Sequence, residues 1–340
     1  MKKFLNHFFI FSIAPLLFFI ALSLIPDLIP DDIPLDNRIE SKIALLKIDT
    51  SKTTVIIAGD SRGERQLIPK IISRHTGFDV INIAVSSGEL ISTIRSIKKH
   101  YSSPKLIFVI SASSWQINDG AIDPGYLSLN CFQKLSKTER IQLFANNTFE
   151  YIRLTKILFA RYKNKLLSNT YTIHSARYDE ETIKRRGFYS TKGQFTPKTS
   201  KLKEEVFLRS HPWYKNMAYD GARWRVFQAA FEEMANCDFR FFIIQSPVSS
   251  YWKKITSNTD VEKMETDYTD RLYHLAEQYN NVELLDFYNN DIKALDDSLY
   301  FDYQHLNENG AIIFSKIVAE IIHHPSNLTT PFLVDSFSIH

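Results

Sequence analysis

The chain has 340 residues, a formal net charge of +3, and 44% hydrophobic against 23% charged residues. This balance is typical of a folded globular protein, and the length allows one large domain or two small ones. So small a net charge gives no reason to expect a nucleic-acid partner. Two cysteines, Cys131 and Cys237, are too few for a thiolate zinc site, although they could pair in an oxidising compartment. We predict no metal and no bound cofactor.

Residues 1–26 have the pattern of an N-terminal membrane anchor. Lys2 and Lys3 precede an uncharged run over residues 8–25, which is about long enough to cross a bilayer, and several aspartates follow it. The positive-inside rule then leaves the N-terminus in the cytoplasm. A cleaved signal peptide is the alternative, and it exports the chain equally. We predict a single-pass protein whose main domain is extracytoplasmic, on the periplasmic or cell-surface side.

Residues 27–52 are predicted to link the anchor to the domain. The first part is rich in proline and aspartate, as linkers are, and residues 39–46 could form a short helix before the first strand.

From residue 53 onward, short apolar runs alternate with helical patterns. This alternation predicts an α/β domain over residues 53–325 with a parallel sheet and right-handed crossovers, followed by a tail over 326–340. The predicted strands are 55–58, 78–84, 105–110, 238–245 and 281–287. The predicted helices between and after them are 64–73, 89–100, 261–278 and 308–322.

The alternation stops between residues 119 and 236. We interpret this segment as a long, mostly helical insertion after the third strand, with helices near 137–144, 149–167 and 221–235. The segment contains the basic cluster Lys184-Arg185-Arg186. A solvated face is the ordinary explanation of such a cluster, and contact with an anionic glycan or lipid headgroup is the alternative.

Ser61 is the candidate nucleophile. It ends the sequence Gly59-Asp60-Ser61 directly after the first buried strand, at the edge where open α/β sheets build their sites. A serine nucleophile needs a base, and the base needs an orienting group. His305 and Asp302 follow the fifth strand and so face the same edge, and their spacing lets the carboxylate reach Nδ1 of the imidazole.

Ordinary structural roles remain open for these residues. Serines at strand ends are usually turn residues, and polar residues near 302–307 could simply cap the last helix, with Asn307 as its N-cap. Other carboxylates could also partner His305, namely Asp286, Asp296 and Asp297.

An acyl-transfer serine also needs donors for the developing oxyanion. The backbone amide of Ser61 is one candidate, and Gly88, in the turn after the second strand, is a second. Asn118 is a weaker third candidate because it falls several residues past the end of the third strand.

Together these motifs resemble the SGNH/GDSL hydrolase superfamily. Its first block matches Gly59-Asp60-Ser61, its second matches Gly88, and its last, Asp-x-x-His-Leu, matches residues 302–306. The resemblance implies a three-layer, flavodoxin-like sandwich with a five-stranded parallel sheet. The third block, Gly-x-Asn-Asp, is not matched, because Ser111-Ala112-Ser113-Ser114 stands there and Asn118-Asp119 comes late without the glycine.

The anchor, the imperfect third block and the insertion are similar to the envelope-modifying branch of that superfamily, which includes the D-alanyl-lipoteichoic-acid biosynthesis and alginate O-acetylation proteins. The similarity implies a serine esterase or O-acyltransferase acting on acyl esters of cell-envelope glycans. Its substrate would be an envelope polysaccharide or an acylated carrier, and its partner a membrane-bound O-acyltransferase. The alternative is a non-catalytic, membrane-tethered scaffold or glycan-binding partner of such an enzyme.

Overall fold

The computed structural model describes residues 26, 36–49, 51–103, 105–119, 129–168, 178–193, 214, 218–290 and 292–324. Within these residues, no helix combines the length and the apolar character needed to span a bilayer. The predicted anchor at 8–25 and the predicted tail at 326–340 lie outside the described residues.

Five parallel strands form one sheet in the order β2-β1-β3-β4-β5. The strands are β1 Thr54–Gly59, β2 Asp79–Asn82, β3 Leu106–Ser111, β4 Arg240–Gln245 and β5 Val282–Asp286. The predicted α/β class and the all-parallel sheet are therefore confirmed. The apolar runs reflect burial on both faces: Ile56 and Phe108 join the core on one side, and Ile57 and Val109 join the core on the other.

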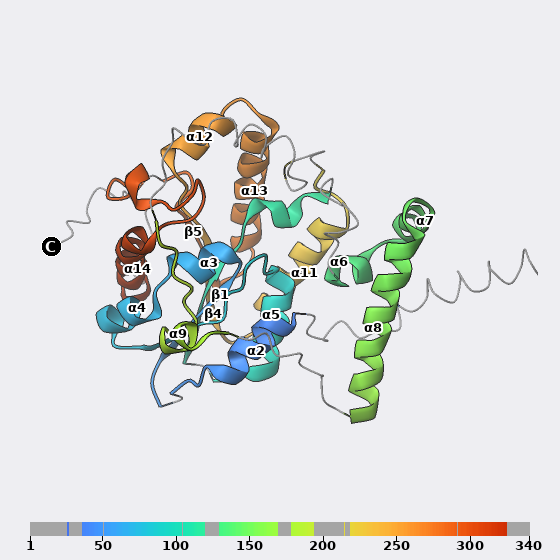
Figure 1. The fold of residues 1–340 in the computed structure, drawn as a ribbon, viewed down its shortest axis with the longest axis horizontal. Coiled ribbons are helices and arrows are strands. Elements are labelled where there is room, and N and C mark those ends of the chain that lie inside the picture. Colours follow the sequence, from blue (N-terminus) through green and yellow to red (C-terminus); the bar gives the residue numbers. More distant parts are fainter. Residues whose placement is uncertain are drawn as a thin grey trace, which may run out of the picture.

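Helices cover both faces of the sheet and make three layers (Figure 1). One face packs against α4 and α14, which also contact each other, and the other packs against α5, α11 and α13. These helices are α4 Pro69–Thr76, α5 Leu90–His100, α11 Ala222–Ala235, α13 Asp260–Ala276 and α14 Glu308–His323.

The single helix predicted over 64–73 is wrong: the structure has α3 Ser61–Gln66 and then α4, which begins at Pro69. Proline fits the first position of a helix, but it pushes the preceding residue into extended backbone. Ile68 accordingly has φ −96° and ψ 108° and separates the two helices. The break leaves Ser61 as the first residue of a six-residue helix directly after β1.

The segment predicted as an insertion divides into two parts. Its last helix, α11, packs beside α5 on the sheet and is the crossover that returns the chain from β3 to β4. The remaining described helices are α6 Leu129–Lys134, α7 Lys137–Asn146, α8 Thr148–Ser168 and α9 Glu180–Lys184. Of these, α7 and α8 lie away from the sheet, as Figure 1 shows.

The stretch after α9 lies along the domain rather than away from it. The backbone N–H of Asn82 donates to Arg186 O at 2.8 Å, and that of Tyr189 donates to Glu64 O at 3.1 Å. These bonds tie residues 186–189 to β2 and to the helix that begins with Ser61.

Helix α2, Asn37–Leu45, lies within the stretch assigned to the linker, at the position of the predicted short helix. It packs on the domain, because Ile39 is fully buried in the core on the α5 side. The other short helices are η1 Ser114–Ile117, α12 Ser250–Thr256 and η6 Asp297–Leu299. No disulfide joins Cys131 and Cys237, both of which the structure describes.

Candidate active site

Ser61 is positioned by the turn that ends β1. Gly59 has φ +105°, and a Cβ there would stand 1.9 Å from the carbonyl oxygen of Ser111, so the close approach of β1 to β3 requires glycine. Asp60 then caps α3, because its Oδ1 accepts the backbone N–H of Arg62 at 3.1 Å. The result is a serine at the carboxyl edge of the sheet, two residues after the end of β1.

The Asp60 carboxylate also holds the ends of β1 and β3 together. It accepts hydrogen bonds from the hydroxyls of Ser111 at 3.0 Å and Ser113 at 2.5 Å, and its side chain is buried. In a sheet with this strand order, β1 and β3 are the neighbours at which the connections diverge to opposite sides. Ser61 therefore lies where such sheets form their binding crevice.

The structure brings Ser61, His305 and Asp302 together in one chain of contacts. The Ser61 Oγ lies 2.8 Å from Nε2 of His305. On the other side of the ring, Nδ1 lies 2.9 Å from Oδ2 and 3.0 Å from Oδ1 of Asp302. Because an ionised carboxylate only accepts hydrogen bonds, Nδ1 carries the ring proton and Nε2 is left to accept the serine proton.

The loop before α14 holds this pair rigidly. The Asp302 Oδ1 accepts the backbone N–H groups of Gln304 at 2.9 Å and His305 at 2.8 Å. Burial opposes the charge on Asp302, but the hydrogen bonds and positive charge of His305, with these backbone donors, hold the pKa of the carboxyl below its usual value. In addition, Nε2 of Gln66 on α3 donates to Gln304 O at 2.6 Å, which links the helix of Ser61 to the loop of His305.

The helix-capping role belongs to Asn307, whose Oδ1 accepts the N–H of Gly310 at 3.1 Å at the start of α14. Asp302 is thus free of that role. The alternative carboxylates are engaged elsewhere, since Asp286 and Asp296 accept backbone N–H groups next to them in the chain and Asp297 accepts from Ser250.

The triad is reachable from solvent, with the side chain of His305 17% exposed and that of Asp302 36% exposed. Among the oxyanion candidates, the Ser61 N–H makes no hydrogen bond within the described part of the chain. The N–H of Gly88 donates to Val85 O at 2.8 Å and closes a turn. Its predicted role as a donor therefore requires that bond to be exchanged for the substrate.

Gly88 has a clear packing role. A Cβ at this position would stand 2.3 Å from the carbonyl oxygen of Gly59, so the loop after β2 can lie against the end of β1 only with glycine here.

Asn118 joins two segments of the fold. It is fully buried at the end of η1, and its Oδ1 accepts the backbone N–H of Ala218 at 3.2 Å. The next residue, Asp119, accepts the N–H groups of Gly221 and Arg223 at the start of α11. These contacts give the Asn118-Asp119 pair a role in fastening the crossover to α11.

No family model matches the chain, and no curated protein matches it. A solved structure from Streptococcus pneumonia, whose description names it after platelet activating factor, is similar with a TM-score of 0.40 and 10% identity, over 85% of this chain and 92% of that one. At this level the likeness bears on neither activity nor substrate.

Sequence patterns did not indicate the residues that support the triad, namely Gln66 and the serines that bind Asp60. Their contacts join segments far apart in the chain, and no local pattern marks them.

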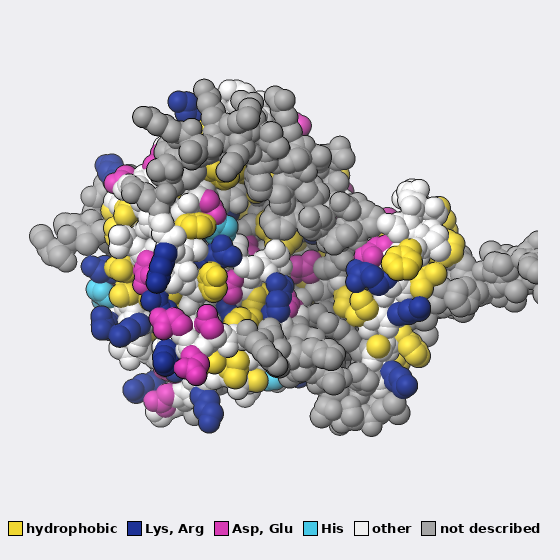
Figure 2. Space-filling view, viewed as in Figure 1, with side chains coloured by type: hydrophobic (Ala, Val, Ile, Leu, Met, Phe, Trp, Pro, Cys, Tyr) yellow, Lys and Arg dark blue, Asp and Glu magenta, His cyan; other side chains and the backbone are white. Residues whose placement is uncertain are grey.

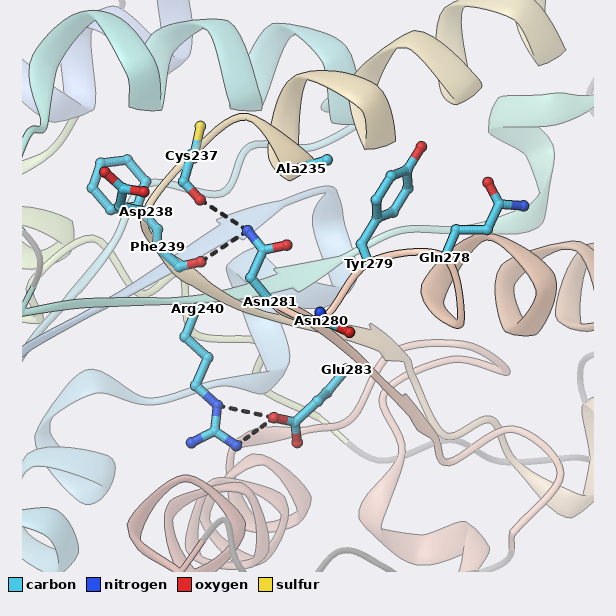
Figure 3. A pocket seen from close by; sticks show the side chains of 10 residues that line it. All are labelled: Ala235, Cys237, Asp238, Phe239, Arg240, Gln278, Tyr279, Asn280, Asn281 and Glu283. Atoms are coloured by element: carbon cyan, nitrogen blue, oxygen red, sulfur yellow. Dashed lines mark hydrogen bonds and ion pairs between the residues drawn. The ribbon is translucent and has the colours of Figure 1, made fainter.

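A hollow of about 710 Å³ lies at the opposite edge of the sheet, where β4 and β5 begin (Figure 3). Three of its polar side chains are already engaged: Nδ2 of Asn281 donates to the carbonyl oxygens of Cys237 and Phe239, and Arg240 pairs with Glu283. The candidate chemistry is therefore at the Ser61 edge.

Proposed function

We propose that this protein is an SGNH-type serine esterase or O-acyltransferase that acts on acyl esters of cell-envelope glycans. The observation that carries the proposal is the contact of Ser61 Oγ with His305 Nε2 at 2.8 Å, with Asp302 bound to the opposite ring nitrogen at 2.9 Å. Ser61 lies near the start of the domain's sequence, and Asp302 and His305 lie near its end. An arrangement of hydroxyl, imidazole and carboxylate in this order is the one that activates a serine.

In the proposed reaction, Nε2 of His305 removes the Ser61 proton as Oγ attacks the acyl carbonyl. Asp302 keeps the ring in the required tautomer and stabilises the imidazolium that forms. The free N–H of Ser61 stabilises the oxyanion, with Gly88 as a second donor when its turn opens. The imidazolium then protonates the leaving alcohol, which leaves an acyl-enzyme on Ser61.

The second half of the reaction decides between transfer and hydrolysis. A glycan hydroxyl or a water, deprotonated by His305, attacks the acyl-enzyme and releases Ser61. The anchor pattern at 8–25 and the helical segment between β3 and β4 support transfer at a membrane surface, to an envelope polysaccharide and beside a membrane-bound O-acyltransferase.

Labelling with a fluorophosphonate serine probe tests the catalytic proposal. We expect the full chain to be labelled and Ser61→Ala to be unlabelled at unchanged melting temperature. Absence of labelling in the intact protein would favour the second candidate, a tethered scaffold, which the missing third motif block supports.

Cell fractionation tests the proposed location. The full chain is expected in the membrane fraction with the domain accessible to protease from outside the cytoplasm, and deletion of residues 1–26 should release it. A deletion product that stays in the membrane pellet would contradict the anchor.

A further inference from the structure

Charged side chains gather around the loop that follows β2, next to the candidate site. Arg38 pairs with Asp36 at 2.7 Å, and its Nη1 donates to Ser86 O at 2.5 Å. The buried Lys42 pairs with Glu64 at 3.0 Å and also donates to Ala84 O. Each of these two cations thus has its own carboxylate, and together they hold the loop in place.

In the part of the chain that the structure describes, Arg65 is the cation of this cluster that no carboxylate pairs with. Within the described residues its contacts are a long hydrogen bond from Nη2 to Ser86 Oγ at 3.4 Å and stacking over the Tyr189 ring, 5.3 Å from the ring centre. Its Nε is buried and has no hydrogen-bond partner in the structure. Ser86 does not neutralise it, because a hydroxyl carries no charge, and that hydroxyl donates to Glu64 at 2.7 Å.

The charges of this cluster therefore do not cancel. Three cations, Arg38, Lys42 and Arg65, face two carboxylates, Asp36 and Glu64, and the unbalanced charge is that of Arg65. A partly buried guanidinium without a paired anion is costly, and it is the side chain best shaped to bind a carboxylate or phosphate through two parallel hydrogen bonds.

Arg65 also lies close to the candidate nucleophile. Both are on α3 at positions i and i+4, so they share one face of the helix with Cβ atoms about 6 Å apart. Its partner Ser86 belongs to the loop that carries Gly88. Tyr189, over whose ring the guanidinium stacks, is 46% exposed, so the stack lies at the surface of the protein.

The basic cluster that stands out in the sequence is different. Lys184 pairs with Glu180, Arg185 with Glu181 and Glu308, and Arg186 with Asp79. Figure 2 likewise shows Lys and Arg side chains interspersed with Asp and Glu over the described part of this face. The unmatched charge becomes visible only when each cation is assigned its partner.

We infer that Arg65, stacked on Tyr189 and beside Ser86, binds an anionic group, a carboxylate or a phosphate, of the substrate on which Ser61 acts. This deepens the proposed function, on which it rests: it makes the substrate an acidic glycan or a phosphate-bearing polymer rather than a neutral one. Arg65 is then a specificity residue that positions the substrate and takes no part in proton transfer.

Binding can be measured apart from catalysis in the full-length Ser61→Ala protein. The probes are methyl glucuronide for a carboxylate, glycerol phosphate for a phosphate, and methyl glucoside as the neutral control, each added at millimolar concentration in a thermal-shift assay. We expect one of the acids, and not the neutral sugar, to raise the melting temperature. The acid that binds identifies the group.

Adding Arg65→Gln to the Ser61→Ala protein should weaken the binding of that acid by about 10- to 100-fold, since two charge-assisted hydrogen bonds are lost. The affinity of Arg65→Lys for the acid should lie between those of the Arg65 protein and of Arg65→Gln, because an ammonium cannot make two parallel hydrogen bonds to one carboxylate or phosphate. Arg185→Gln is the matched control and should bind as before. If Arg65→Gln lowers the melting temperature in the absence of ligand, the binding of the acid is compared between the Arg65 protein and Arg65→Lys instead.

In the protein that retains Ser61, the same acid should compete with turnover of the neutral ester p-nitrophenyl acetate, and Arg65→Gln should remove this competition. Binding of neither acid, equal binding of the neutral sugar, or undiminished binding after Arg65→Gln would each overturn the inference. If ester turnover is absent or survives Ser61→Ala, the proposed function fails, whereas acid binding that depends on Arg65 would still stand.

Discussion

Replacing Asp302 by asparagine isolates the orienting role of the carboxylate. In the structure, Asp302 accepts the Nδ1 proton of His305 at 2.9 Å and two backbone N–H groups through Oδ1. Asparagine keeps an oxygen for the backbone donors but presents its amide N–H to Nδ1, which moves the ring proton to Nε2. A protonated Nε2 cannot accept the proton of Ser61. We expect turnover to fall about 10³- to 10⁴-fold, which corresponds to about 4–5.5 kcal/mol.

The loss should not come from unfolding. Because the Asp302 side chain is 36% exposed, its exchange for an amide should cost the fold about 1 kcal/mol or less. The assay is p-nitrophenyl acetate turnover together with the rate of fluorophosphonate labelling, and melting curves accompany both. Asp286→Asn is the matched control, because that carboxylate caps the turn after β5, and it should retain activity within about threefold. Turnover of Asp302→Asn within tenfold of the unmodified protein would refute the assigned role.

Two further predictions concern the packing of the domain. Glu40 is buried, which opposes its charge, but hydrogen bonds from two basic side chains of α5 lower its pKa to about 2. Its ionised form therefore stabilises the fold above about pH 4.5, and that stabilisation is lost as the pH falls toward 2. Glu40→Gln should lower the melting temperature at pH 7 by about 5 °C. It should also make the melting temperature fall less steeply between about pH 4.5 and 2. Melting temperatures equal to those of the unmodified protein at every pH would count against this role of Glu40. Gly88→Ala, whose Cβ would stand 2.3 Å from Gly59 O, should lose more than about 2 kcal/mol of stability together with labelling. Gly77→Ala, where φ is +74° but the space is open, should cost about 1 kcal/mol and leave labelling intact, and equal effects of the two would contradict the packing argument.

Local patterns located most elements because their causes are local. Strands buried on both faces need unbroken apolar runs, and each of the five strands overlaps a predicted one, with bounds that differ by at most two residues. The error at 64–73 has a local cause as well, since Pro69 ends one helix and begins another. The role of α11 as a crossover could not be predicted, because helices that pack on the sheet and helices that stand apart share the same apolar periodicity.

What the sequence by itself determined is the set of residues able to do chemistry and the edge of the sheet on which they lie. In a parallel sheet, every loop after a strand opens at the same edge, so Ser61 after β1 and His305 after β5 were bound to face the same side. Only the tertiary structure decided how those groups are used. The Gly88 amide closes a turn, Asn118 fastens a distant segment, and Arg65 is left without an acid, because hydrogen bonds and ion pairs between remote residues depend on how the elements pack.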